Sequence, residues 1–316
     1  MYNLKHTFKQ VAKPMIKLAV VAGCFYFIYL KLATNTSVSW NEFSNSLKLI
    51  FDKGFLIIIF VFILSAINWL LEILKWKVLV NTQQKLNYKS ALKQCLSALT
   101  ASLITPNRVG DYVAKAIYYP KDKAKKIVGL NAIGQFSQLF ITLVFGIMGL
   151  IYMYLNFGLN ASINLNFIWI LVAVILILSM SKYGRFYINR VKQFYISIPL
   201  LSHLKVLGIS LLRYVVFSHQ FYLLMLIFGL KIVYLPSMMA IFSMYLLASI
   251  VPTLAILDWA VKGSVAVFVF GFLHANTFLI LEISLLMWAL NFAIPALIGS
   301  VFVFQYKTSK ALAPSL

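Results

Sequence analysis

The chain has 316 residues, of which 62% are hydrophobic and only 11% charged, and its formal net charge is +21. Soluble domains are closer to half apolar and a quarter charged, so this composition excludes an ordinary soluble fold. Nucleic-acid binding would call for basic residues interleaved with aromatic ones along a groove, and no such pattern accompanies the lysines. Lysines in the loops of a membrane protein instead set its orientation and contact anionic lipid head groups.

Eight hydrophobic elements follow one another along the chain. Several contain windows of about 18 residues almost without charge, long enough to cross a hydrocarbon core of about 30 Å as a helix. Barrel strands would alternate in polarity, which these windows do not. We therefore predict an all-α, polytopic membrane protein with a single transmembrane domain over residues 1–316. The elements cover residues 14–34, 54–76, 90–105, 127–155, 166–181, 206–229, 236–272 and 277–305.

The basic residues orient these elements, because cytoplasmic loops carry an excess of Lys and Arg. With the basic loops assigned to the cytoplasm, 22 of the 28 basic residues lie inside and four outside, while Arg213 and Lys262 lie in membrane segments. Four lysines precede the first apolar run and no small-residue cleavage site follows it, so we expect a retained first span. Both termini are expected in the cytoplasm.

The element at residues 90–105 does not fit a simple span. Basic loops flank it on both sides, so both of its ends belong in the cytoplasm. A re-entrant hairpin over residues 90–119, broken near Pro106, satisfies this requirement.

The element at residues 236–272 poses the mirror-image problem. It enters from outside, is broken at Pro252, and must leave the last span free to end inside, so we expect a second hairpin that opens to the outside. Span, hairpin and span then occur twice in opposite orientations, over residues 54–155 and 206–305. This inverted-topology repeat, with about six full spans and two re-entrant hairpins, is typical of secondary transporters.

Each expected hairpin carries the same charged pattern. "TPNRVGDYVAK" (residues 105–115) and "VPTLAILDWAVK" (residues 251–262) both contain a proline, then an aspartate followed by an aromatic residue, then a lysine four positions after the aspartate. On a helix, each aspartate and lysine share one face. For the first pair, an interfacial position facing water is an equally good interpretation. The apolar flanks of the second pair favour a polar cavity within the membrane.

The breaks also create candidate anion sites. Each returning half-helix would begin near Gly110 or Leu257 with free backbone N–H groups and the positive end of its dipole, which can hold a phosphate. Arg108 could add a bidentate contact, and the aspartates could hold an ammonium group. The candidate substrate-binding residues are Arg108, Asp111, Lys115, Asp258 and Lys262.

Further polar residues lie within the apolar elements. Secondary candidates for the same site are Gln135, Gln138 and Arg213. For the amides, hydrogen bonding between helices is the preferred interpretation. Glu72 is expected to pair with Lys75, and Glu282 is expected to be exposed near the outer end of the last span.

Enzyme signatures are missing from the sequence. It contains no hydrolase triad motif, P-loop, dinucleotide fingerprint or zinc motif, and its longest hydrophilic stretch is too short to fold alone. We therefore expect no catalytic residues, no bound metal and no cofactor. An intramembrane enzyme is the lowest-ranked interpretation.

Four stretches, taken together and in order, resemble the membrane domain of the lysylphosphatidylglycerol synthase/flippase family. "LEILKWKVLV" (71–80) resembles the end of an early span in that family. "TPNRVGDYVAKAIYY" (105–119) resembles its P-x-x-x-G-E-x-x-R signature, with Asp111 for the glutamate and Lys115 for the arginine. "VPTLAILDWAVKGSVAVF" (251–268) resembles its second hairpin, with Asp258 as the acid, and "NFAIPALIGSVFVF" (291–304) resembles its terminal span.

The resemblance implies the translocating part of that family without its synthase domain. The expected function is binding and translocation of a phospholipid or lipid-linked head group in a bacterial cytoplasmic membrane. The alternative is a non-transporting membrane subunit that supplies lipid to, or docks, a separate glycosyltransferase or aminoacyltransferase. The expected partners are membrane lipids and not nucleic acid, and a homo-oligomer or a partner transferase stays open.

Overall fold

The computed structural model describes residues 55–103, 105, 108–158, 182–251, 253 and 257–305. These residues form helices joined by short turns, with no strand among them, which confirms the all-α class. In chain order the elements are α3 (Phe55–Asn81), α4 (Tyr88–Ser102), α5 (Val109–Ile117), α6 (Lys121–Phe157), α8 (Lys182–Ile196), α9 (Leu200–Ile227), α10 (Tyr234–Ile250), α11 (Asp258–Gly271), α12 (Thr277–Trp288), the π-helix η2 (Ala289–Ala293) and α13 (Ile294–Phe304). The expected spans at residues 14–34 and 166–181 lie outside the described residues, as do Pro106 and Pro252.

Four helices in the described ranges are long and apolar enough to cross a membrane. They are α3, α6, α9 and the continuous segment Thr277–Phe304 that α12, η2 and α13 form. A span needs roughly 20 residues, and each of these has at least 27. With 37 residues, α6 is about 55 Å long at 1.5 Å per residue. Its lysine-rich first turns therefore extend beyond an apolar layer of about 30 Å.

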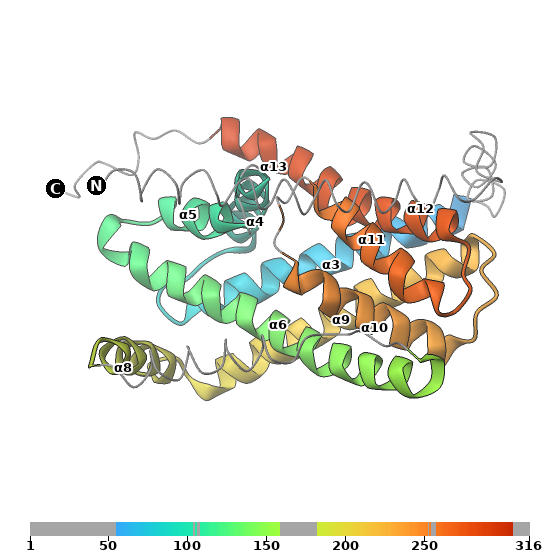
Figure 1. The fold of residues 1–316 in the computed structure, drawn as a ribbon. Helices are drawn as coiled ribbons and strands as arrows, with labels where there is room; N and C mark the ends of the chain where they lie inside the picture. The colour runs from blue at the N-terminus through green and yellow to red at the C-terminus, as the bar shows by residue number, and fades with distance from the viewer. Residues whose placement is uncertain are drawn as a thin grey trace, which may run out of the picture.

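The long helices pack in pairs. In Figure 1, α3, α6, α9 and α10 run across the view, with α6 beside α10 and α3 beside α9. A large apolar core, which includes Phe221, Ile241 and Phe270, joins α9, α10 and α11. A second core around Trp76 joins α3 to α4 and α6. Residues from both cores line the cavity described below.

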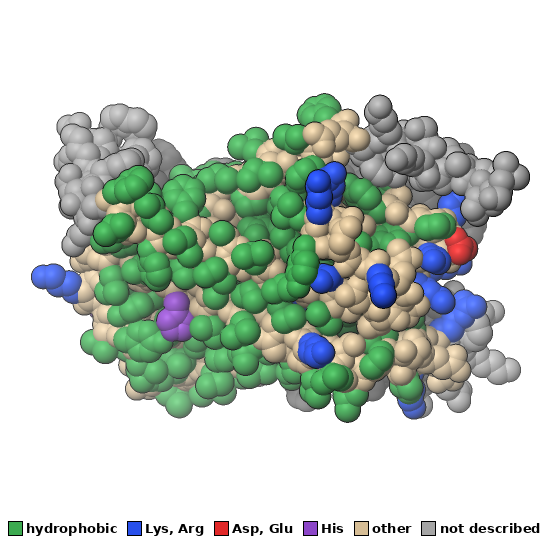
Figure 2. Space-filling model, turned by 180° about the vertical axis from the view of Figure 1, so that it is seen from behind, with side chains coloured by type: hydrophobic (Ala, Val, Ile, Leu, Met, Phe, Trp, Pro, Cys, Tyr) green, Lys and Arg blue, Asp and Glu red, His purple; other side chains and the backbone are tan. Residues whose placement is uncertain are grey.

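The outer surface is apolar. Large hydrophobic side chains such as Phe60, Ile147, Leu212 and Leu297 are exposed on all four long segments. A soluble monomer rarely exposes so much contiguous apolar surface, whereas a lipid-facing surface requires it. Figure 2 shows hydrophobic side chains over most of one face, with most of the basic side chains on its right-hand half.

Both segments expected to break are interrupted helices. The first segment consists of two helices, α4 and α5, and the second consists of α10 and α11. The starts of the returning helices, Val109 and Asp258, agree with the sequence-based expectation within one residue. The two segments differ in direction. Figure 1 views α4 nearly end-on, so it crosses the long helices steeply, whereas α10 and α11 both run along them.

A glycine lets α4 approach α13 closely. A Cβ at Gly299 would collide with the backbone carbonyl of Leu96 and with the hydroxyl of Thr100. Thr100 Oγ1 donates to the backbone oxygen of Ala296 at 2.7 Å, which ties the two helices together. The crossing helix α4 is thus held against the C-terminal span by backbone contact.

The π-helix η2 has a local cause. Pro295 lacks the N–H that would donate to the carbonyl of Asn291 four residues earlier. The helix widens here, and Trp69 Nε1 on α3 donates to that carbonyl at 3.0 Å. Such π-bulges occur frequently at functional sites. Asn291, which lies in this π-helix, lines the cavity described below.

Candidate functional site

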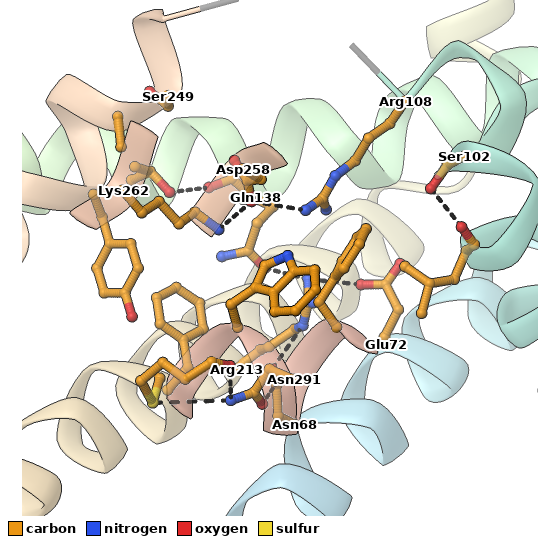
Figure 3. Close-up of a pocket in the computed structure, with 18 of the residues that line it drawn as sticks. Asn68, Glu72, Ser102, Arg108, Gln138, Arg213, Ser249, Asp258, Lys262 and Asn291 are labelled. Carbon is orange, nitrogen blue, oxygen red and sulfur yellow. Dashed lines mark hydrogen bonds and ion pairs between the residues drawn. The ribbon is translucent and has the colours of Figure 1, made fainter. Parts of the chain in front are cut away.

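A cavity of about 520 Å³ lies among α3, α4, α5, α6, α9, α10, α11 and α12 with η2. It brings together residues that are far apart in the sequence, and Figure 3 shows part of its polar lining. All eight residues predicted from the sequence line it, namely Arg108, Asp111, Lys115, Gln135, Gln138, Arg213, Asp258 and Lys262.

The turn before α5 places Arg108 at the cavity. Arg108 has φ of 56° and ψ of 29°, a left-handed conformation that is uncommon outside glycine and costs about 1 kcal/mol or more. Thr105 Oγ1 accepts a hydrogen bond of 2.8 Å from the N–H of Gly110 and so caps the start of α5. A Cβ at Gly110 would collide with the backbone of Ala101, so the turn requires glycine there.

Arg108 connects the two interrupted segments. Its Nη2 lies 3.4 Å from Asp258 Oδ2 at the start of α11, 150 residues away, and Lys262 Nζ lies 2.7 Å from the same oxygen. In Figure 3 the two basic side chains reach Asp258 from opposite sides. The Arg108 guanidinium also lies over the Phe292 ring, 5.1 Å from its centroid, which adds a cation–π contact. The sequence predicted the Asp258–Lys262 pair but not the Arg108–Asp258 contact.

Asp111 is enclosed by donors. Lys115 Nζ lies 3.3 Å from Asp111 Oδ2, while Asn131 Nδ2 and Gln135 Nε2 donate to the same oxygen at 2.6 and 3.4 Å. Lys115 also donates to Asn131 Oδ1 at 2.8 Å and lies over the Trp76 ring. Both members of the ion pair are buried, so the water-facing interpretation of this pair is wrong. The long helix α6 supplies both amides that donate to Asp111.

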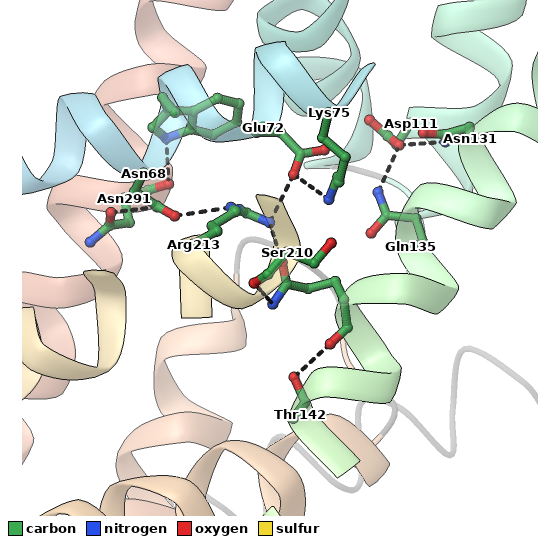
Figure 4. A network of polar contacts seen from close by, with 12 residues as sticks. Asn68, Glu72, Lys75, Asp111, Asn131, Gln135, Thr142, Ser210, Arg213 and Asn291 are labelled. Carbon is green, nitrogen blue, oxygen red and sulfur yellow. Dashed lines mark hydrogen bonds and ion pairs between the residues drawn. The ribbon is translucent and has the colours of Figure 1, made fainter. Parts of the chain in front are cut away.

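Glu72 forms the third charged cluster. Its Oε2 lies 2.7 Å from Lys75 Nζ, which confirms the expected pair, and 2.8 Å from Arg213 Nη1 on α9. Arg213 Nε donates to Asn68 Oδ1 at 2.9 Å, and Nη1 lies 3.5 Å from Gln138 Oε1. Figure 4 shows Arg213 between Asn68 and Glu72.

A chain of amides extends this cluster to η2. Asn68 Nδ2 donates to Asn291 Oδ1 at 2.8 Å, and Asn291 Nδ2 donates to Gln220 Oε1 at 2.9 Å. Gln220 in turn donates to Ser65 Oγ at 2.7 Å. This is the helix–helix hydrogen bonding expected for intramembrane amides. The sequence showed that these amides are polar but not that they form one network around Arg213.

One expectation about the last span is wrong. Glu282 was expected to be exposed, but it is buried in α12 together with Ile280 and Ile283. The physical reason is packing, because α12 lies against α11 and α9, and Glu282 faces that interior.

The cavity lining carries a positive excess. It contains the four basic residues Arg108, Lys115, Arg213 and Lys262 but only the three acids Glu72, Asp111 and Asp258. One negative charge on a ligand would balance this lining. Across the described ranges, no group of three His, Cys, Asp or Glu side chains is placed to hold a metal ion.

Comparison of the chain with protein-family models, curated proteins and solved structures finds no match.

Proposed function

We propose that this protein binds the head group of a phospholipid or lipid-linked molecule in the charged cavity and translocates it across the membrane. The observation that carries the proposal is the cavity of about 520 Å³, lined by seven charged side chains, within a chain that has four membrane-length helices. Ligand sites of about 300–1,000 Å³ are usual, so a polar head group fits this volume.

The energetic argument concerns charges in a membrane. Each charged side chain at mid-bilayer costs roughly 2.5–3.5 kcal/mol on insertion scales, so such residues mark functional pathways. Acyl chains could stay in the bilayer against the exposed apolar side chains of the long helices. The resemblance of residues 105–119 and 251–268 to the lysylphosphatidylglycerol synthase/flippase family supports the same function.

The proposed membrane arrangement has about six spans and two re-entrant hairpins, with both termini on the cytoplasmic side of a bacterial inner membrane. The interruptions between α4 and α5 and between α10 and α11 support it. The Arg108–Asp258 contact also supports it, because it joins the two interrupted segments at one cavity. Residues 54–155 and 206–305 would then form the two inverted repeats.

The test uses purified protein reconstituted into liposomes that contain a phospholipid with a fluorescent acyl chain. Quenching of the outer leaflet followed over time measures translocation. Wild-type protein is expected to accelerate translocation over protein-free vesicles, and the double variant Arg108→Gln/Lys262→Gln to slow it at least about tenfold, a loss of about 1.4 kcal/mol.

The matched control is Lys89→Gln, which removes an exposed lysine of α4 outside the cavity lining. A wild-type rate equal to that of protein-free vesicles would refute translocation. If a transferase then co-purified with the protein, the result would favour the non-transporting subunit.

A further inference from the structure

We infer that Arg108 and Lys262 form a binding site for the phosphate of an anionic lipid, and that this phosphate replaces Asp258 as the partner of Arg108. The inference rests on the proposed function and narrows its substrate class. In it, the three acids hold the protein's own cations and do not bind an amine of the ligand.

The first step is the local charge at Asp258. Two cations share one oxygen of this carboxylate, Lys262 at 2.7 Å and Arg108 at 3.4 Å. One positive charge is therefore left over at this point of the cavity wall. Of the two contacts, the one to Arg108 is longer than an optimal charge-assisted hydrogen bond of about 2.7–2.9 Å.

The second step is access. The side chains of Arg108 and Lys262 are 48% and 33% exposed, whereas that of Lys115 is only 2% exposed. Arg213 is less exposed than either, and Glu72, Asn68 and Gln138 already occupy its Nη1 and Nε groups. A ligand entering the cavity therefore reaches the Arg108 and Lys262 cations most readily.

The third step concerns the acids. Asp111 Oδ2 is contacted by Lys115, Asn131 and Gln135, and Glu72 Oε2 by Lys75 and Arg213. An ammonium group that contacted one of these two oxygens would compete with the cations already placed there, and displacing a buried cation from its carboxylate is strongly unfavourable. A phosphate ester without an amine meets no such penalty.

The fourth step is competition for Arg108. A guanidinium binds a phosphate through two parallel hydrogen bonds, which are stronger than one contact of 3.4 Å to a carboxylate. Once the phosphate holds Arg108, Asp258 retains only Lys262. The contact between the turn before α5 and α11 is then released, so ligand binding removes this ion pair between the two interrupted segments.

The test measures binding of water-soluble, short-chain phosphatidylglycerol to the purified full-length protein in detergent. Arg108→Gln and Lys262→Gln are each expected to weaken binding at least about tenfold, because each removes a cation that makes charge-assisted hydrogen bonds to the phosphate. Asp258→Asn is expected to tighten binding about tenfold, because it removes the competitor. A merely structural role for Asp258 would not raise the affinity. Lys89→Gln is the control and leaves binding unchanged.

Two further ligands define the class. Short-chain aminoacylated phosphatidylglycerol is expected to bind no more tightly than phosphatidylglycerol, and glycerol phosphate, which lacks acyl chains, to bind more weakly. Weaker lipid binding by Asp258→Asn, or a preference for the aminoacylated lipid that Asp258→Asn abolishes, would overturn the inference. Equal binding of glycerol phosphate would overturn a lipid as the ligand.

The set of variants keeps the test informative even if one variant does not fold. If Asp258→Asn does not fold, the Arg108→Gln and Lys262→Gln variants still test the inference. Unchanged phosphatidylglycerol binding in both variants would refute the proposed phosphate-binding site. The translocation assay is independent of this one. Failure of translocation with the expected binding pattern would refute the proposed function alone, and translocation with the reverse binding pattern would refute this inference alone.

Discussion

At the scale of single residues, two ion pairs with the same sequence spacing differ in their surroundings. Asp111–Lys115 and Asp258–Lys262 are both four residues apart. Lys115 is buried among Trp76 and the amides of α6, whereas Lys262 is partly exposed to the cavity. Removing one partner of a buried pair leaves an uncompensated charge, whereas exposed pairs contribute little to stability.

This difference predicts unequal effects of two matched substitutions. Lys115→Met should destabilise the protein by about 3–5 kcal/mol because Asp111 would lose its buried cation. Lys262→Met should change stability by less than about 1 kcal/mol, since Arg108 still faces Asp258. Unfolding of both variants in the same detergent, measured by heat or denaturant, checks the prediction. Equal losses of stability in the two variants would contradict it.

Local spacing made part of the site predictable. Residues three or four positions apart are neighbours on a helix surface, which is enough to place Asp111 beside Lys115, Asp258 beside Lys262 and Glu72 beside Lys75. Contacts such as Arg213–Glu72 depend on how α9 packs against α3, and no local pattern contains that information. The exposure expected for Glu282 was wrong for the same reason.

At the scale of helices, the crossing of α4 over α13 depends on one close backbone approach. Gly299 permits it, because any Cβ there would meet the backbone carbonyl of Leu96, which cannot move away as a flexible side chain can. Gly208 on α9 offers a matched comparison, since nothing lies within 4 Å of the position its Cβ would occupy.

We expect Gly299→Ala to lower stability by about 1–3 kcal/mol through overpacking. Gly208→Ala should be neutral or stabilise by up to about 1 kcal/mol, because alanine favours the helix. Thermal unfolding of the two purified variants measures both effects. A Gly299→Ala protein as stable as Gly208→Ala would show that α4 does not pack on α13 in this way.

The interrupted segments were predictable, but the direction of α4 was not. Prolines and charges interrupt an apolar run, and both returning helices start where the sequence indicates. The steep crossing of α4 results from backbone contact at Gly299 and the hydrogen bond from Thr100, which join residues about 200 positions apart. The π-helix follows from Pro295 only once Trp69 is placed beside it.

At the scale of the whole molecule, opposite ends carry different loops. The connection between α5 and α6 lies at the left of Figure 1, and the connection between α9 and α10 lies at the right. Lys123, just after the first connection, and Lys231, in the second, are both exposed. From the distribution of basic residues, we expect the first connection in the cytoplasm and the second outside.

This assignment predicts opposite labelling of two cysteine variants. In a background with Cys24 and Cys95 replaced by serine, Lys231→Cys should react with an impermeant maleimide added to intact cells. Lys123→Cys should react only after the membrane is permeabilised. Labelling of Lys123→Cys in intact cells would reverse the orientation, and labelling of both would refute a single orientation.

Composition predicted the class of the molecule, but not how the polar residues in its interior are arranged. An apolar surface and long helices follow from hydropathy alone. The sequence singled out eight polar and charged residues, and the packing of the helices brings all of them to one cavity. The amide chain from Asn68 to Gln220 came only with the packed structure.

The carboxylate shared by Arg108 and Lys262 has a consequence for release. Because Asp258 belongs to the same chain as Arg108 and Lys262, it competes with any ligand for these two cations as an intramolecular competitor, with a high and constant effective concentration. An anion bound to these cations competes continuously with the Asp258 carboxylate, which cannot diffuse away. Under the proposed function, this competition limits the affinity for the ligand and favours its release.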